Sequence, residues 1–177
     1  SVALELAGKI FADFSSCTVA IVGAGVMGME TARNFWQAKP KGMIFLSRTA
    51  ERAQALACEF GGTAGALADL GRTLVAADIV VTQLAAQAPV VTRAMVEEAL
   101  KYRTRSLFII DIAVPRNVEE SIAGLGNTFL YNLDDLKSIA EANYENRKGE
   151  AQKAKRIIQE EMDKFLPQYQ QRLGAYA

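Results

Sequence analysis

The chain has 177 residues, of which 50% are apolar and 23% are charged, a profile typical of a globular domain that buries a real core. Its 20 basic and 20 acidic side chains cancel, so the composition shows no electrostatic footprint for nucleic acid or for an anionic membrane. The sequence contains no histidine, the commonest general base and nitrogen metal ligand, and we expect no metal site.

No apolar run reaches the ~20 residues that a membrane-spanning helix needs, and no signal peptide is visible. We therefore expect a cytoplasmic protein. The two cysteines, Cys17 and Cys58, have no C-x-x-C spacing, and we expect both to be small buried thiols in a reducing compartment.

The N-terminal residues 2–14 carry apolar side chains at helical spacing, which predicts a helix directly before the first strand. The chain begins with Ser1 rather than methionine, so we expect an excised fragment of a longer protein. We interpret residues 1–14 as a linker helix from a missing upstream domain.

The next feature is an apolar run that ends in three glycines. Residues 17–22 predict a strand and residues 26–38 a helix. The connecting residues have the G-x-G-x-x-G spacing; they are Gly23, Ala24, Gly25, Val26, Met27 and Gly28. The first glycine permits a sharp turn, the second a close approach to a pyrophosphate, and the third close packing of helix on strand. Because a strand and a helix flank the turn, we predict that these six residues bind a dinucleotide; the alternative is a purely structural turn.

The end of the second predicted strand, residues 43–46, indicates which dinucleotide is bound. Enzymes that prefer NAD place an acidic residue about 20 positions beyond the glycines, where it binds the ribose hydroxyls. Here the chain reads Ser47, Arg48 and Thr49, and an arginine with two hydroxyls suits a 2′-phosphate. We therefore predict NADPH as the cofactor. The alternative is that Arg48 is merely solvated and that Thr49 caps the helix predicted over residues 50–60.

The remaining elements alternate between strand and helix. We expect further strands over residues 63–65, 78–82, 107–111 and 129–131, and helices over 66–76 and 92–101. This order predicts an α/β fold, a Rossmann-like doubly wound parallel sheet over residues 15–135, with a preceding helix and a long C-terminal helical extension. Ligands bind at the carboxyl ends of such strands, and we add Thr82 to the cofactor-binding residues.

Two charged residues near the fifth strand have two interpretations each. Asp111 could face the ligand cleft, or it could be a structural acid bonded to backbone N–H groups. Arg116 could contact a polynucleotide or another domain, but a surface salt bridge is favoured.

Residues 136–177 differ in composition from the rest of the chain. They are dense in mixed charge, and a loose apolar stripe runs through them at helical spacing: Ile139, Ala142, Ala154, Ile158, Met162, Phe165 and Tyr169. A helix so long and polar does not belong to a globular core. We predict a spinal or dimerisation helix that packs on a partner.

Several stretches together resemble one family, the glutamyl-tRNA reductases of tetrapyrrole (porphyrin) biosynthesis. The matching stretches are residues 1–7, 23–28, 47–49 with 51–53, 111–116, and 130–136 with the charged helix behind them. The glycine turn is common to many enzymes, whereas the last two stretches are far more specific. The resemblance covers nearly the whole chain, but only the middle portion of a full-length family member.

The resemblance implies an NADPH-dependent oxidoreductase that reduces glutamyl-tRNA to glutamate-1-semialdehyde. It implies a homodimer formed through the C-terminal helix, and contact with glutamyl-tRNA through domains that this chain lacks. Family members carry their nucleophilic cysteine in an N-terminal domain, and neither Cys17 nor Cys58 matches its motif. We therefore assign no catalytic residue and expect this chain alone to be inactive.

The chain departs from the family after the fourth strand, where members show small hydroxyl residues and glycine near the nicotinamide. Here Gln83 and Leu84 are bulkier, and we hypothesise that they disturb the seating of the nicotinamide. Two alternative functions remain open: a shikimate- or siroheme-type NAD(P) dehydrogenase domain, and a non-catalytic nucleotide-sensing dimerisation module.

Overall fold

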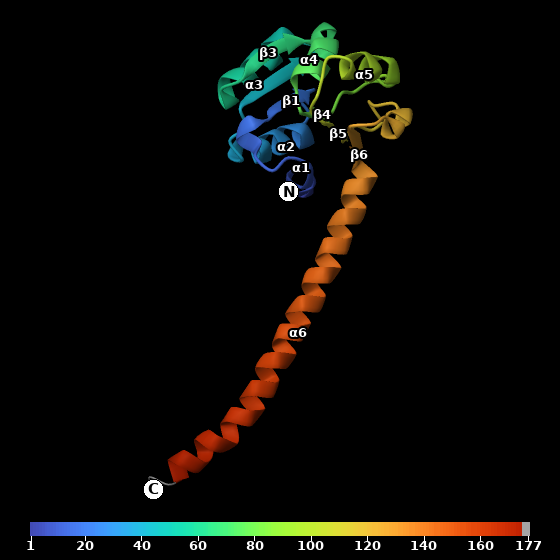
Figure 1. The fold of residues 1–177 in the computed structure, drawn as a ribbon. Helices are drawn as coiled ribbons and strands as arrows, with labels where there is room; N and C mark the ends of the chain where they lie inside the picture. The colour runs from blue at the N-terminus through green and yellow to red at the C-terminus, as the bar shows by residue number, and fades with distance from the viewer. Residues whose placement is uncertain (175–177) are drawn as a thin grey trace. The chain divides into compact units, whose positions relative to one another are not determined.

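The computed structural model describes the backbone of residues 1–174 and the side chains of residues 1–163. Its 6 strands form one parallel sheet in the order β3-β2-β1-β4-β5-β6 (Figure 1). The strands are β1 (Thr18–Val22), β2 (Gly42–Ser47), β3 (Thr63–Ala66), β4 (Ile79–Thr82), β5 (Leu107–Asp111) and β6 (Thr128–Asn132). The chain moves outward from β1 to β3, returns to β4 beside β1, and moves outward again to β6. This is the predicted doubly wound sheet, and the predicted fold class is confirmed.

The helices are α1 (Val2–Ile10), α2 (Val26–Gln37), α3 (Ala50–Phe60), α4 (Leu70–Ala76), α5 (Arg93–Leu100) and α6 (Leu133–Gly174). The described residues also include three short 3-10 helices, Phe14–Ser16, Leu67–Asp69 and Glu120–Gly124. The helix predicted over residues 2–14 ends earlier because Phe11 is extended and Asp13 caps a separate turn, accepting from the N–H of Ser15 at 2.8 Å.

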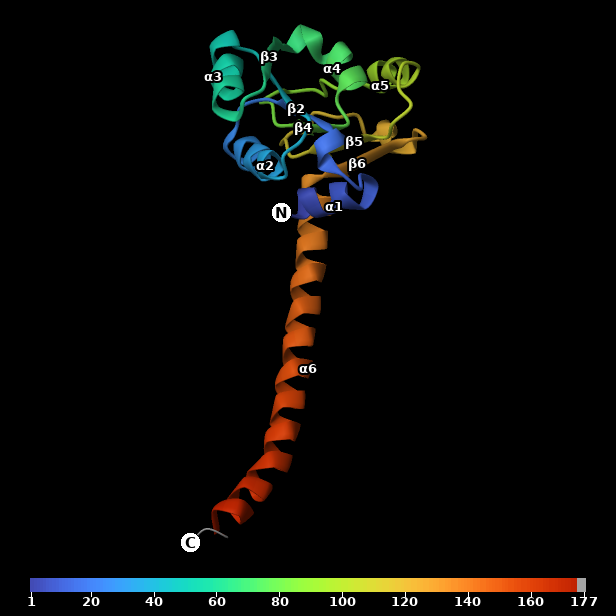
Figure 2. The ribbon, with the colours of Figure 1, turned by 60° about the vertical axis from the view of Figure 1, so that its left-hand side comes forward.

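Helices cover both faces of the sheet, and strand alternation decides which side chains meet which helices. On one face, Val80 and Ile109 pack with α4, α5 and the third 3-10 helix in one core cluster. On the other face, Phe45 stacks on Phe60 of α3, with ring centroids 5.6 Å apart. Figure 2 shows α4 and α5 on one side of the sheet and α1 and α2 on the other. Strands β4 and β5 are fully buried, which explains why they read as continuous apolar runs.

The chain divides into two compact units, Ser1–Leu136 and Lys137–Ala177. The first holds the sheet and its helices, including α1, whose Leu6 and Ala7 are buried. The functional roles predicted for residues 1–14, 15–135 and 136–177 stay predictions.

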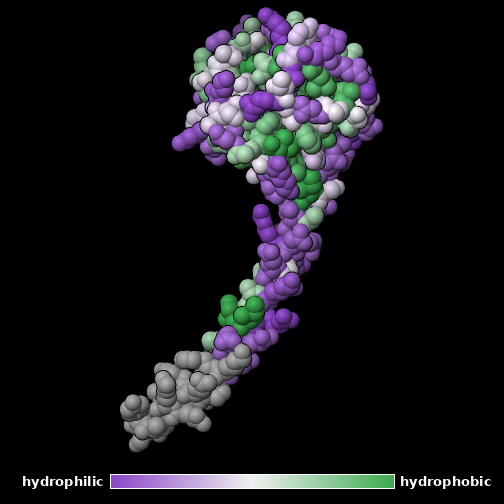
Figure 3. All heavy atoms as spheres, viewed as in Figure 1, coloured by the Kyte–Doolittle hydropathy of each residue, from purple (hydrophilic) through white to green (hydrophobic). Residues whose placement is uncertain are grey.

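The described residues of the second unit all belong to helix α6, whose first turn lies in the first unit. This helix begins with a reciprocal cap, in which Asn132 accepts from the N–H of Asp135 at 3.0 Å and Asp135 accepts from the N–H of Asn132 at 2.8 Å. Figure 3 shows apolar side chains gathered on one stretch of α6. Up to residue 163, the large apolar residues that α6 exposes are Tyr144, Ile157, Ile158 and Met162. Of the predicted stripe, Phe165 and Tyr169 lie beyond the side chains that the structure describes. Within the described residues, no helix is both long and apolar enough to cross a membrane.

Candidate functional site

The glycine turn joins the end of β1, at Val22, directly to the start of α2, at Val26. Gly23 has a φ of +106°, a conformation that side chains rarely adopt, and its N–H donates to the carbonyl of Leu46 at 2.8 Å. A Cβ on Gly23 would overlap the backbone carbonyl of Gln83. The first position of the motif therefore requires glycine on two counts.

The second and third glycines differ from the first. They are needed because they leave space for a neighbouring group, and not because of their backbone conformation. Gly25 is the N-cap of α2 with a φ of −78°, which any residue can adopt. A Cβ there would overlap the Oε1 atom of Gln83, and a Cβ on Gly28 would come within 2.8 Å of it. Among the described residues, no group accepts a hydrogen bond from the N–H of Val26 or Met27. The first turn of α2 thus presents free donors and a positive dipole.

A cavity of about 370 Å³ opens beside this turn. Its walls come from the ends of β1 and β2, the start of α3 and the loop after β4, and the lining residues are Gly23, Ala24, Gly25, Ser47, Arg48, Thr49, Arg52, Gln83, Leu84 and Ala85. The cavity lies at the carboxyl end of the strands, where the sheet order reverses between β1 and β4, the usual ligand site of such sheets. Six of the predicted site residues therefore share one cavity, and Val26, Met27 and Gly28 form the adjoining helical turn.

Two arginines line the cavity at the end of β2. Arg48 is exposed beyond the strand, and Arg52 is exposed in the first turn of α3; neither has a carboxylate partner among the described residues. Thr49 occupies the N-cap position of α3, but its side chain makes no capping bond. The hydroxyl of Ser47 accepts from the N–H of Thr49 at 3.3 Å. Arg52 was not among the predicted cofactor-binding residues, although a second basic residue in the helical turn after Arg48 was an available signal.

Thr82 lies outside the cavity. It is fully buried, and its hydroxyl donates to Oδ1 of Asp111 at 3.0 Å. The Asp111 carboxylate, 2% exposed, also accepts from three backbone N–H groups at 2.8–3.1 Å, those of Ala113, Asn117 and Val118. Of the two interpretations left open for Asp111, the geometry favours the structural acid.

The loop after β4 is held firmly on both sides of Gln83. The N–H of Gln83 donates to the carbonyl of Val22 at 2.8 Å. The buried amide of Asn117 accepts from the N–H of Leu84 at 2.6 Å and donates to its carbonyl at 3.1 Å. Leu84 is buried in the core cluster, so of the two bulky residues only Gln83 reaches across the turn, where its Oε1 accepts from the N–H of Gly28 at 2.5 Å.

The two cysteines stand apart from this site. Cys17 is buried as expected; burial raises the pKa of its thiol, and the nearby charge of Asp78 raises that pKa further, which makes Cys17 a poor nucleophile. The expectation of a buried thiol is wrong for Cys58, which is exposed because Ala57 and Phe60 occupy the core-facing side of α3. Among the described residues, no group of three or more histidine, cysteine or acidic side chains could hold a metal ion.

Arg116 forms surface ion pairs rather than facing the cavity. Its guanidinium lies 3.5 Å from Glu120 and 3.3 Å from Asp134, and its side chain is 41% exposed. This is the salt-bridge interpretation favoured from the sequence.

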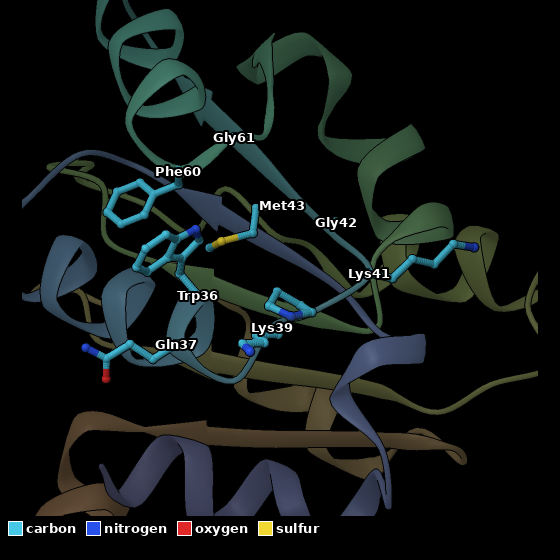
Figure 4. A pocket seen from close by; sticks show the side chains of 9 residues that line it. Trp36, Gln37, Lys39, Lys41, Gly42, Met43, Phe60 and Gly61 are labelled. Carbon is cyan, nitrogen blue, oxygen red and sulfur yellow. The ribbon is translucent and has the colours of Figure 1, made fainter.

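A separate cavity of about 440 Å³ lies at the opposite end of the strands, beside the start of β2. Trp36 and Phe60 meet there edge to face, with ring centroids 6.1 Å apart, and Met43 points between them (Figure 4). Its only charged lining residues are Lys39 and Lys41, and it contains no acid–base pair.

Known proteins resemble this chain over most of its length. The family described as Shikimate / quinate 5-dehydrogenase matches residues 5–139. Glutamyl-tRNA reductase of a Sulfurihydrogenibium species is 43% identical over 93% of this chain and 37% of its own length, and that of Trichlorobacter lovleyi is 44% identical over 92% and 38%. The solved structure of glutamyl-tRNA reductase from Methanopyrus kandleri matches with a TM-score of 0.81 and 37% identity, over 92% of this chain and 41% of that one.

These similarities confirm the resemblance to glutamyl-tRNA reductases that the motifs predicted. The chain spans less than two fifths of the length of the curated relatives it matches, 37% and 38%. The matched part contains the sheet, the glycine turn and the cavity beside it.

Proposed function

The chain belongs to the shikimate / quinate 5-dehydrogenase family, and we propose that it is the NADPH-binding module of a glutamyl-tRNA reductase. The family match and the resemblance imply a nicotinamide cofactor. The choice of NADPH rests on one observation: two arginines, and no acid, line the cavity at the end of β2.

The residues present fit such a cofactor. The space beside Gly25, in which only the flexible end of the Gln83 side chain lies, suits a pyrophosphate together with the unpaired N–H groups of Val26 and Met27. Arg48 and Arg52 carry the two positive charges that a 2′-phosphate requires, since charge-assisted bonds to phosphate are the strongest that a protein offers. The Ser47 and Thr49 side chains bring hydroxyls to the same wall. Thr82 instead supports the opposite wall, the loop after β4, through its hydrogen bond to Asp111.

The role of this chain in the reaction is to bind the cofactor and to orient it. When bound, NADPH supplies the hydride that reduces the activated glutamyl group. The cavity is formed by strand ends, and Asp111 and Asn117 hold the loop after β4 in place. This rigid frame would keep the bound cofactor in one orientation. We assign no residue of this chain to acid–base or covalent catalysis. The proposal includes a cytoplasmic location, a homodimer formed through α6, and contact with glutamyl-tRNA by parts of the protein outside this chain.

A second candidate is a shikimate-type dehydrogenase domain, which the description of the matching family favours. The two candidates share a cofactor site and differ in substrate. Oxidation of shikimate by this chain with NADP⁺ would support the second candidate, and we expect none.

The proposal is tested by titrating the chain with NADPH and with NADH while following nicotinamide fluorescence. We expect NADPH to bind at least tenfold more tightly, and Arg48→Ala and Arg52→Ala each to weaken NADPH about tenfold while leaving NADH unchanged. Arg33→Ala is the matched control, because Arg33 is an exposed arginine that pairs with Glu59 away from the cavity. Equal binding of both dinucleotides, or equal loss in the control, would contradict the assignment.

A further inference from the structure

Hydrogen bonds on both sides restrain the backbone of Gln83. Its N–H is bonded to β1, Thr82 before it is tied to Asp111, and Leu84 after it is clamped by both ends of the Asn117 amide. The close approach of its carbonyl to Gly23 adds a steric restraint. The side chain is therefore directed at the glycine turn by a rigid frame.

The carboxamide of Gln83 reaches the place that the motif keeps clear for phosphate. Its Oε1 accepts from the N–H of Gly28 at 2.5 Å, and a Cβ on Gly25 would overlap this same atom. The carboxamide thus lies against the second and third glycines and uses one of the donors at the positive end of α2. The side chain also lines the cavity that holds Arg48 and Arg52.

We propose that Gln83 is an internal competitor for the pyrophosphate, a residue that sets the cofactor affinity of the turn. The inference rests on the proposed function. In the free protein the neutral carboxamide bonds to the Gly28 N–H and fills the groove over Gly25. A phosphate engages the unpaired N–H groups of Val26 and Met27 first, and then displaces the carboxamide, because an anion bonds an N–H about twice as strongly as a neutral acceptor.

The experiment compares NADPH affinities of the intact chain and of three variants. Gln83→Ala removes the competitor, and we expect NADPH to bind about three- to tenfold more tightly, the range of one net neutral hydrogen bond. Gln83→Glu places a negative charge at the same donor, and we expect NADPH to bind at least tenfold more weakly, with the difference shrinking as salt rises. Gln87→Ala is the matched control, since Gln87 is an exposed glutamine of the same loop that does not line the cavity.

A second measurement follows the Gly28 amide by hydrogen exchange without cofactor. We expect this amide to exchange faster in Gln83→Ala than in the unmodified chain, and to remain protected in Gln87→Ala. Faster exchange with unchanged or weaker NADPH binding means that Gln83 only braces the turn, and overturns the proposal. If no variant binds either dinucleotide while all stay folded, the cofactor assignment itself has failed. That failure can be distinguished from failure of the Gln83 proposal alone, because Arg48→Ala then has no effect on dinucleotide binding either.

Discussion

The three glycines of the turn have different physical roles, although they belong to one motif. Gly23 combines a positive φ with a position at which any Cβ would overlap the backbone carbonyl of Gln83, which is held in place. Gly25 and Gly28 face only the flexible end of the Gln83 side chain. We therefore expect a substitution at the first position to lower the stability of the fold, and a substitution at the second to lower the affinity for the cofactor.

We predict that Gly23→Ala destabilises the chain by clearly more than Gly61→Ala. Both glycines have positive φ, 106° and 68°, so both substitutions incur a backbone penalty of roughly 1–3 kcal/mol. A Cβ on Gly61 meets open space, whereas a Cβ on Gly23 overlaps backbone. Urea unfolding of the two variants measures the difference. Equal losses would mean that β1 and the β4 loop separate easily at this point.

At the scale of elements, the cavity depends on how β5 restrains the loop after β4. Asp111, at the end of β5, gathers four hydrogen bonds from Thr82 and from the segment that follows β5. Asn117, in that segment, then fixes Leu84. Two neighbouring strand ends thus become one rigid wall, from which Gln83 projects.

We predict that Asp111→Asn lowers the free energy of unfolding by about 2–4 kcal/mol, because the new amide NH₂ group faces backbone donors and leaves buried groups unsatisfied. Asp134→Asn is the control: Asp134 is exposed, its one ion-pair partner among the described side chains is Arg116, and we expect a change within about 0.5 kcal/mol. Guanidinium unfolding measures both. A variant of Asp111 that keeps full stability but loses NADPH binding would instead place this carboxylate in the ligand cleft.

Local patterns explain what could be predicted at this scale. Some segments consist of consecutive residues whose structure follows from short-range rules. They are the buried runs of β4 and β5, the glycine turn and the Ser47–Thr49 segment. The 3-10 helix Glu120–Gly124 was not predicted, because it is held by the single buried side chain of Ile122 rather than by a periodic face.

The site contacts that escaped prediction join residues far apart in the sequence. The bond from Gly28 to Gln83 spans 55 positions, and the Leu84–Asn117 clamp spans 33. No local pattern records such a pair. The bulk of Gln83 and Leu84 was visible in the sequence, but only the structure separates them, since one side chain enters the core and the other the turn.

At the scale of the whole molecule, the two units have different sources of stability. The unit Ser1–Leu136 buries its own core, with β1, β4 and β5 enclosed. As far as the structure describes it, the unit that follows is a polar helix, and isolated helices are only marginally stable in water because most helical stability comes from tertiary packing. Within its described side chains, Ile158 and Met162 are 62% and 47% exposed, four residues apart on one face.

This face leads to the last prediction: the chain sediments as a dimer at micromolar concentration, and Ile158→Glu combined with Met162→Glu makes it a monomer. Burying one isoleucine or methionine contributes about 1.5–3 kcal/mol, so a symmetric pair of helices loses that stabilisation at both positions on each helix, and it gains buried charge. Gln152→Glu is the control, since it adds one such charge about 120° from Ile158 and about 80° from Met162 around the helix, at 100° per residue. Analytical ultracentrifugation separates the outcomes. A dimer that survives the double substitution uses another surface, and an unmodified chain that is monomeric at this concentration contradicts the proposed pairing of α6.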